Sequence, residues 1–248
     1  MDRITTEQYF HELQAQRRAT DRVPLQFDDA DYLEHETWIR PAFAELGDVR
    51  GLRVLDYGCG HGMAAVVLAR AGASVTAIDL SSGYLEEAHA RARANGVTID
   101  AVQANAEQLP FADATFDRVW GCAILHHLDI ASAAATLRRV LRPGGRAVFS
   151  EPWGGNPLLS YARNKLPYPG KQRTPDELPL TRRHLRQLKA TFPSIHFRGF
   201  QLLSMACRVV PRPQLRKRLD WCDAMLLERV PALEHFCRYV VLTLRTRQ

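Results

Sequence analysis

Three glycines at alternate positions follow an acidic residue in the segment Val54 to Gly62, which reads VLDYGCGHG. Glycine reaches positive φ freely and lets backbone N–H groups come close to a ligand. The apolar run before the glycines (Leu52, Val54 and Leu55) is typical of a buried strand, and a helical pattern runs from Met63 to Ala71. A strand, a glycine loop and a helix in this order are typical of a nucleotide-binding turn. We therefore expect a nucleotide at this loop.

The spacing of the glycines argues against a dinucleotide. The fingerprint G-x-G-x-x-G, counted from Gly58, would need a glycine where Met63 stands. Asp56 ends the predicted strand, where its carboxylate would repel a pyrophosphate but tolerate a cation, so the expected ligand carries positive charge. The segment resembles the first motif of class I S-adenosylmethionine (SAM)-dependent methyltransferases, whose cofactor has a sulfonium and an ammonium group. A plain structural turn and an NAD enzyme are the alternatives.

A second acidic residue, Asp79, follows a β-rich run from Ser74 to Ile78 and lies 17 residues beyond Gly62. A carboxylate at the end of a second strand accepts both hydroxyls of a ribose as a charge-assisted pair. The resemblance implies that Asp79 is the ribose-binding acid, with Leu80 beside it. Without the glycine loop, Asp79 would be an ordinary acid at the entry of the helix predicted from Tyr84 to Asn95.

A third strand, from Ile99 to Gln103, runs into the segment NAEQLPF, which begins at Asn105. This segment resembles the family's DAExLPF, whose acid accepts a hydrogen bond from the adenine amino group. The amide oxygen of Asn105 still accepts, although the bond is no longer charge-assisted. The fourth strand, from Phe116 to Trp120, leads to Cys122, which we expect beside the methionine portion. The cofactor-binding residues that the resemblance implies are Asp56, Tyr57, Gly58, Cys59, Gly60, Gly62, Asp79, Leu80, Asn105, Ala106, Glu107 and Cys122.

A histidine pair in the segment Leu125 to Leu128 follows the fourth strand, near the expected position of the methyl group. Methyl transfer needs a base only if the nucleophile carries a proton, and an imidazole suits proton removal at neutral pH. We predict that His126 is this base and that Glu151, after the fifth strand, orients it. The pair resembles the His and Glu of carbon-methylating polyketide synthase domains. Alternatively, the histidines cap a helix or touch the cofactor, and Glu151 only fixes a loop.

Strands and helices alternate through the core, which predicts a parallel sheet with ligands at the carboxyl ends of its strands. The implied fold class is α/β: a seven-stranded, mostly parallel, doubly wound sheet with an antiparallel last strand, an N-terminal helical lid and C-terminal insertions. We divide the chain into a lid (1–50), a SAM-binding core (51–152) and a third part (153–248). The third part holds a substrate-binding loop, a basic insert and the last strands of the same domain.

Two helical stretches, 4–19 and about 31–46, precede the first strand. In the methyltransferases that this chain resembles, such helices fold over the cofactor. Their aromatic residues are candidates to line the site, against the alternative that they only pack in the core: Tyr9, Phe10, Tyr32 and Trp38. The proline-rich segment 152–180 is the expected substrate-binding loop, with charges at Arg163, Lys165, Lys171 and Arg173.

Composition limits the remaining choices. With 248 residues, 46% of them hydrophobic, the chain can bury a full core. It has no apolar run of about 18 residues, and its N-terminus is charged where a signal peptide would be apolar. Five cysteines without framework spacing indicate free thiols in a reducing compartment, so a cytoplasmic location is expected. Because no C-x-x-C pair is present, no metal is expected.

The net charge of +6 is unevenly distributed. Residues 1–159 hold 15 basic against 21 acidic side chains, whereas residues 160–248 hold 18 against 6. A basic face of this kind favours an anionic substrate, an acidic membrane surface or nucleic acid. A solvated surface without a partner is the alternative.

We therefore expect an S-adenosylmethionine-dependent methyltransferase that moves a methyl group to a small-molecule acceptor, with an oxygen or carbon nucleophile favoured and S-adenosylhomocysteine as product. The sequence lacks the N/D-P-P-Y/F segment of adenine-N6 enzymes and the Pro-Cys nucleophile of cytosine-C5 enzymes. The alternatives are an RNA or other nucleic-acid methyltransferase that uses the basic last third, and a SAM-binding relative that does not transfer methyl. The sequence sets neither the acceptor nor the oligomeric state.

Overall fold

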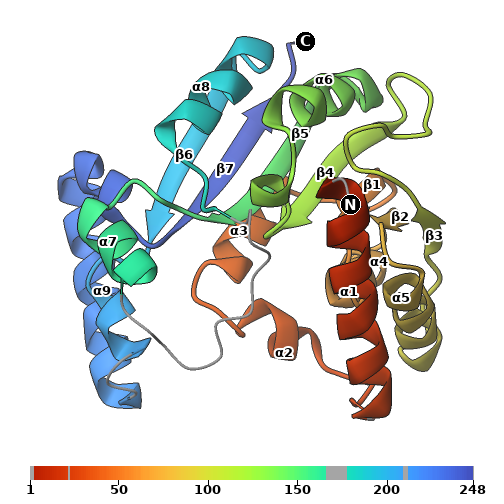
Figure 1. Ribbon diagram of the computed structural model, residues 1–248, viewed down its shortest axis with the longest axis horizontal. Helices are drawn as coiled ribbons and strands as arrows, with labels where there is room; N and C mark the ends of the chain where they lie inside the picture. Colours follow the sequence, from red (N-terminus) through yellow and green to blue (C-terminus); the bar gives the residue numbers. More distant parts are fainter. Residues whose placement is uncertain (1–2, 22, 166–177, 209–211, 248) are drawn as a thin grey trace.

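The computed structural model describes residues 3–21, 23–165, 178–208 and 212–247, and its centre is a seven-stranded sheet (Figure 1). Strands β1 to β5 pair in parallel, and β7 is antiparallel to both β5 and β6. The order is β3-β2-β1-β4-β5-β7-β6, which confirms the predicted fold class. The strands are β1 (Arg53–Tyr57), β2 (Ser74–Asp79), β3 (Asp100–Gln103), β4 (Phe116–Cys122), β5 (Leu141–Pro152), β6 (Ser194–Phe200) and β7 (Tyr239–Arg245).

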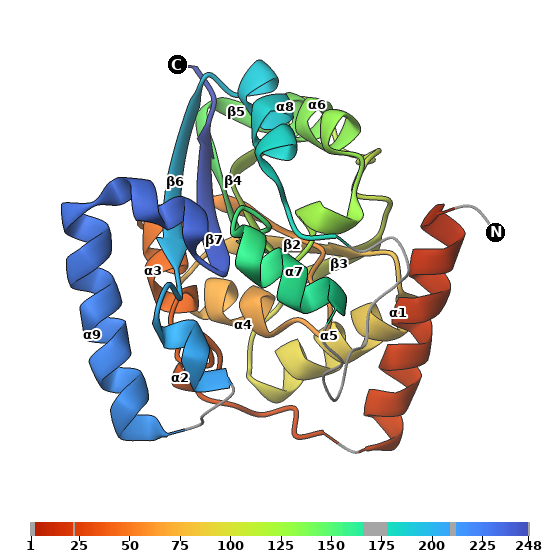
Figure 2. The same cartoon turned by 60° about the vertical axis from the view of Figure 1, so that its left-hand side comes forward.

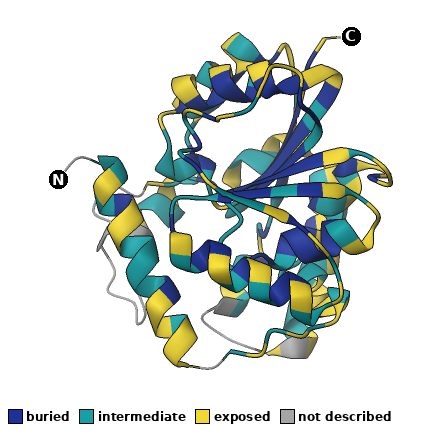
Figure 3. Cartoon of the chain, turned by 90° about the vertical axis from the view of Figure 1, so that its right-hand side faces the viewer, coloured by how far each residue is buried: buried dark blue, intermediate teal, exposed yellow. Residues whose placement is uncertain are grey.

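Helices cover both faces of this sheet (Figure 3). The adjacent residues Val54 and Leu55 are both fully buried but belong to different apolar clusters, because side chains alternate between the faces of a strand. Helices α3, α4 and α5 pack on the Val54 side, and α6 and α8 pack on the Leu55 side. The helices are α1 (Arg3–Thr20), α2 (Asp29–Leu33), α3 (Ile39–Leu46), α4 (Met63–Arg70), α5 (Ser82–Ala94), α6 (Ile130–Val140), α7 (Pro157–Lys165), α8 (Arg182–Thr191) and α9 (Pro213–Arg229), with 3-10 turns η1 (Leu125–His127), η2 (Ser204–Arg208) and η3 (Pro231–Phe236).

Two predicted elements differ from the structure in their extent. The helical stretch expected over 31–46 is two helices, α2 and α3, separated by residues 34–38. Strand β5 begins before the Pro143-Gly144-Gly145 turn, and its pairing with β4 jumps from Leu141 opposite Phe116 to Arg146 opposite Arg118. Gly144 has a φ of 72°, so the turn signal marks a bulge within the strand and not a separate loop.

The proposed substrate-binding segment 152–180 contains α7, which the sequence did not predict. Lys171 and Arg173 lie outside the described residues, as do the side chains of Arg163 and Lys165, so their role stays a prediction. The basic helix α9 and the N-terminal helix α1 lie at opposite ends of the molecule (Figures 1 and 2). Residues at the carboxyl ends of the central strands share a cavity with residues of α1, and none of its lining residues comes from α9.

Candidate cofactor site and its lid

A cavity lies at the carboxyl ends of the central strands, below α1. Eight of the twelve predicted cofactor-binding residues line it: Gly58, Gly60, Asp79, Leu80, Asn105, Ala106, Glu107 and Cys122. They come from four separate stretches of sequence and meet because parallel strands end at one edge of the sheet. The other four, Asp56, Tyr57, Cys59 and Gly62, do not line the cavity. These four residues are next to lining residues in the sequence, and their separate contacts are described below.

The three loop glycines are needed for different physical reasons. All three have positive φ (74°, 49° and 80° for Gly58, Gly60 and Gly62). A Cβ at Gly58 would lie 2.7 Å from the Ile124 side chain, and one at Gly62 would lie 2.5 Å from the Cβ of Ala88. A Cβ at Gly60 would meet nothing within 4 Å. Gly58 and Gly62 therefore permit packing of the loop, while Gly60 keeps the backbone accessible from the cavity.

The carboxylate of Asp79 is held in place by two backbone amides. Gly60 donates to its Oδ2 at 2.9 Å, and Ser81 donates to its Oδ1 at 3.0 Å. Burial raises the pKa of Asp79, and these amide bonds oppose that rise. An ionised carboxylate has about four acceptor positions, so a fixed and partly satisfied Asp79 on the cavity wall fits the ribose hydroxyls of the cofactor.

Asp56 is a buried acid behind the glycine loop. Its side chain is 1% exposed, and no described residue donates a hydrogen bond to its Oδ2. Burial, followed by the Asp79 carboxylate, raises its pKa to about 7. A buried charge is costly unless it is paired, so a cationic ligand group near the loop would relieve this cost. The expectation that Asp56 tolerates a cation fits this environment.

Tyr57 and Asn105 use their polar atoms to shape the cavity wall. The Tyr57 hydroxyl donates to the backbone oxygen of Ala106, which ties β1 to the NAEQLPF segment. The Asn105 Oδ1 accepts from the Glu107 amide at 2.9 Å, a local turn that occupies part of its capacity. Cys59 is enclosed beside the loop, where burial raises the pKa of its thiol. Tyr57 does not line the cavity itself, and it shapes the wall through its hydrogen bond to Ala106.

Helix α1 lies beside the cavity, but the four aromatic candidates of the two N-terminal helical stretches do not line it. Tyr9 is exposed, and neither Phe10 nor Tyr32 lines the cavity; Tyr32 packs against Phe43. Trp38 stacks on Tyr239 at a centroid distance of 3.9 Å in the core. The polar side of α1 faces the cavity instead, through Arg3, Ile4, Glu7, His11 and Gln14. In the sequence, the spacing i, i+4 of Glu7 and His11 was the pattern that could have indicated a polar face on this helix.

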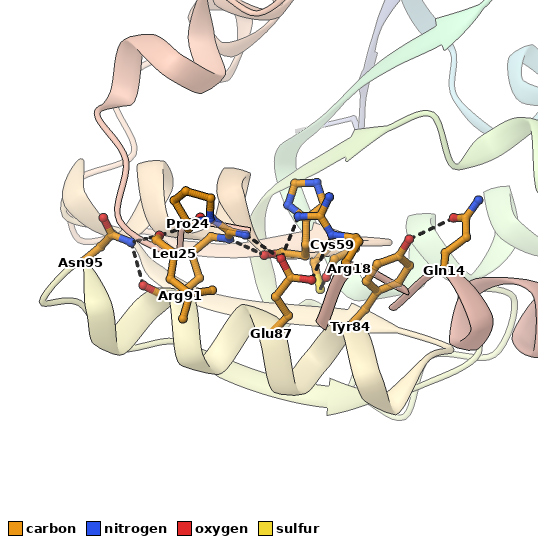
Figure 4. Close-up of polar contacts among 11 residues, drawn as sticks. Gln14, Arg18, Pro24, Leu25, Cys59, Tyr84, Glu87, Arg91 and Asn95 are labelled. Carbon is orange, nitrogen blue, oxygen red and sulfur yellow. Dashed lines mark hydrogen bonds and ion pairs between the residues drawn. The ribbon is translucent and has the colours of Figure 1, made fainter. Parts of the chain in front are cut away.

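The lid docks on α5 through side-chain bonds (Figure 4). Arg18 donates to both oxygens of Glu87, at 2.8 and 3.0 Å, and the Tyr84 hydroxyl donates to Gln14 at 2.9 Å. Glu87 also accepts from Arg91 at 2.6 Å, a residue only 2% exposed. At the other end of the lid, Arg3 contacts Glu107 and the backbone oxygen of His127. The lid is thus fixed at both ends.

The structure brings His126 and Glu151 together, but outside the cavity lining. Glu151 Oε2 lies 2.7 Å from His126 Nδ1, and Glu151 Oε1 accepts from the amides of Ile124 and Leu125 at 2.9 and 2.8 Å. Glu151 therefore orients the histidine and also fixes the turn that carries it. Of the histidine pair, His127 lines the cavity. The catalytic role of His126 stays a prediction.

This combination of sheet order, glycine loop and cavity acid defines the class I SAM-dependent methyltransferase domain. Residues 55–149 match the family described as "Methyltransferase domain", and this part of the chain belongs to it. SAM is the cofactor of that family.

Known proteins similar to this chain agree with the assignment. O-methyltransferase rstn1 of Aspergillus nomiae is 37% identical over 128 residues, which cover 50% of this chain and 57% of that protein. A solved SAM-dependent methyltransferase from Mesorhizobium loti is 22% identical with a TM-score of 0.56, covering 86% of this chain and 99% of that one. A solved cyclase, SpnF, is 24% identical with a TM-score of 0.55, covering 84% and 80%. Both structures show the fold alone.

The chain spans 57%, 41% and 38% of the lengths of three curated relatives that it matches. Because the chain covers only part of each relative, these relatives do not define the acceptor. No helix in the described parts of the chain is long and apolar enough to cross a membrane.

Proposed function

We propose that this protein transfers a methyl group from SAM to a small-molecule acceptor with an oxygen or carbon nucleophile. The observation that carries the proposal is the Asp79 carboxylate, fixed by the Gly60 and Ser81 amides on the wall of a cavity that α1 covers. The O-methyltransferase relative, 37% identical over 128 residues, supports an oxygen acceptor.

The residues of this chain supply binding and orientation. Asp79 would hold the ribose, the open backbone at Gly60 would border the cofactor, and Asp56 would favour its positive charge. When bound, the cofactor would supply a sulfonium methyl group whose bond to sulfur breaks as an aligned nucleophile bonds to the methyl carbon, with S-adenosylhomocysteine as the leaving group. Alignment alone provides an effective molarity of roughly 10⁵ to 10⁸ M. The contacts of α1 with α5 and Glu107 hold the helix beside this cavity.

Proton removal from the acceptor is the second part of the proposal. His126, oriented by Glu151, is the proposed base, with Nε2 as the atom that receives the proton since Nδ1 contacts Glu151. This role would require the acceptor to reach a side chain that is 4% exposed. A phenolate or a free amine as acceptor would need no base.

Two alternatives make different demands on the structure. A nucleic-acid methyltransferase would use the basic last third, but α9 lies at the far end of the molecule from the lid (Figure 2). A SAM-binding protein that does not transfer methyl would need only the cofactor residues.

We propose a small acceptor, whose anionic or neutral character is open, and a cytoplasmic location, which the five free cysteines support. We also propose the division into 1–50, 51–152 and 153–248.

The proposal is tested by incubating the protein with methyl-labelled SAM and either a cell metabolite extract or total RNA. Label should enter the metabolite pool and should be lost with the Asp79→Ala variant. Label in RNA would support the nucleic-acid alternative. Binding of SAM without label transfer to either pool would support a relative that does not transfer methyl.

A further inference from the structure

Three potential metal ligands converge on the wall of the cavity. Glu7 and His11 belong to the lid helix α1, and His127 belongs to η1. Each offers one ligand atom, and these atoms all lie within 4.8 Å of one another. The Glu7 Oε2 atom is 3.4 Å from His11 Nε2 and 3.2 Å from His127 Nδ1. Glu7 and His127 are well shielded, at 7% and 12% side-chain exposure, and His11 is partly exposed at 26%.

The separations suit a metal better than a direct ion pair. Two ligand atoms about 2.0 to 2.1 Å from a tetrahedral Zn²⁺ lie roughly 3.3 Å apart. Charge-assisted hydrogen bonds between nitrogen and a carboxylate are typically shorter, at about 2.7 to 2.9 Å. The two measured distances, 3.2 and 3.4 Å, bracket the separation expected between ligands of one ion.

Both sides of the cluster are positioned by other contacts. Glu7 and His11 are separated by one helical turn, so their side chains lie on one face of α1. The turn that carries His127 is fixed by Glu151, which accepts from the Ile124 and Leu125 amides at 2.9 and 2.8 Å. Arg3 contacts the backbone oxygen of His127 and so joins the lid to the same turn. The ligand set is therefore assembled by the docking of α1 on the turn that carries His127.

We propose that Glu7, His11 and His127 bind a divalent transition-metal ion when the lid is closed. Two imidazole nitrogens and one carboxylate oxygen form a donor set that Zn²⁺ and Fe²⁺ accept, whereas Mg²⁺ and Ca²⁺ prefer oxygen ligands. Three protein ligands leave a further coordination position on the ion. Because all three residues line the cavity, this position would face the cavity interior. The ion would connect the lid to the core.

This site could not be expected from sequence motifs. His127 is 120 positions beyond Glu7, and only the docking of α1 brings them together. No metal was expected because the sequence lacks a C-x-x-C pair. That motif indicates a cysteine-ligated zinc site, whereas the ligands proposed here are two histidines and a glutamate.

The test uses the full chain after treatment with a chelator, titrated with Co²⁺ and followed by visible absorption, and with Zn²⁺ by calorimetry. We expect one equivalent of Co²⁺ with visible absorption bands, and at least tenfold weaker binding in Glu7→Gln and in His127→Asn. The triple variant with His11→Asn should show no such bands, while it keeps every cysteine. His89→Asn, an exposed histidine on α5, is the matched control and should bind as wild type.

A second readout distinguishes a metal site from adventitious binding. Because the ligands come from both the lid and η1, Zn²⁺ should slow hydrogen exchange of the α1 amides in wild type but not in the triple variant. Circular dichroism confirms that each variant folds. Absence of Co²⁺ bands in wild type, or equal Zn²⁺ binding by the triple variant, would overturn the proposal and leave a hydrogen-bonded acid–base cluster. SAM binding by the metal-free wild type, measured in the absence of added metal, tests the proposed function separately, because the three substituted residues also line the cofactor cavity.

Discussion

Glu151 contacts His126 with one carboxylate oxygen and the backbone amides of the same turn with the other. Both oxygens belong to a fully buried residue near the carboxyl end of β5. A single carboxylate thus sets the orientation of an imidazole and the shape of the segment that presents His127 to the cavity. The two readings of Glu151, as an orienting acid and as a loop-fixing acid, describe the same side chain.

The proposed base has a kinetic signature. His126→Asn should lower kcat by roughly 10² to 10⁴ with little change in cofactor affinity, since general base catalysis contributes that much. The wild-type rate should rise with pH as the imidazole loses its proton. Stopped-assay kinetics at saturating substrate measure this effect. Equal turnover of wild type and variant would leave orientation as the source of the rate, and His89→Asn serves as the control on the surface.

Cofactor affinity should depend on Asp79. Asp79→Ala should weaken SAM binding by about 1.5 to 3 kcal/mol, the range for a hydrogen bond to a charged group. Asp79→Asn should weaken it less, because an amide oxygen still accepts from the Gly60 amide. Calorimetry with S-adenosylhomocysteine gives the affinities, and Asp100→Ala, exposed at the start of β3, is the control. Unchanged affinity in Asp79→Ala would remove this residue from the site.

The loop glycines should separate binding from stability. Gly60→Val should abolish SAM binding, because its side chain enters open space at the cavity, and the positive φ of 49° should add backbone strain of roughly 1 to 2 kcal/mol without unfolding the sheet. Gly62→Ala should lower the free energy of unfolding by roughly 1 to 3 kcal/mol, since its Cβ would lie 2.5 Å from Ala88. Chemical denaturation and calorimetry on both variants check this. The reverse pattern would contradict the assigned roles.

The stability of the cofactor-free protein should fall between roughly pH 4 and pH 7 because of Asp56. Its pKa is raised to about 7 by burial and by Asp79, whereas the unfolded chain loses this proton near pH 4. In this range the folded state holds a proton that the unfolded state has released. The free energy of unfolding therefore falls as pH rises, until about pH 7. Asp56→Asn should remove this dependence and should be more stable relative to wild type at pH 8 than at pH 5.

Thermal melts of the cofactor-free protein at the two pH values measure this difference. The exposed Asp113→Asn variant is the control and should follow the wild-type pH dependence. Identical pH profiles for wild type and Asp56→Asn would show that the buried carboxyl does not hold its proton in the folded state.

Local sequence patterns predicted the sheet and most of the cavity wall. Strand ends such as Asp79 and Cys122 are set by the alternation of strands and helices, and parallel pairing then brings them to one edge. Helical spacing did not show which side of α1 meets the cavity, and the candidates Tyr9 and Phe10 do not line it. Its polar side faces the cavity, and the contact of Glu7 with His127 depends on tertiary docking that no local pattern encodes.

Partial occupation of polar atoms was a second limit. Asn105 and Glu107 line the cavity as expected, yet the Asn105 oxygen accepts from the Glu107 amide, and Glu107 accepts from the Asp129 amide at 2.7 Å. Sequence position identified these residues, but their hydrogen-bond partners depend on the turn between β3 and β4. A motif match therefore locates a residue without saying how much of its bonding capacity is left for a ligand.

The buried Arg91 gives helix α1 a fixed pivot. Its guanidinium donates to the backbone oxygens of Pro24 and Leu25, and Asn95 also donates to Leu25, so the chain just after α1 is tied to α5. An 18-residue helix is about 27 Å long at roughly 1.5 Å per residue, so a tilt of about 10° at this pivot moves the opposite end by about 5 Å. The Arg3 end would travel farthest, and its contacts with Glu107 and with the backbone oxygen of His127 would have to break first. These contacts therefore hold α1 against tilting with the longest lever arm.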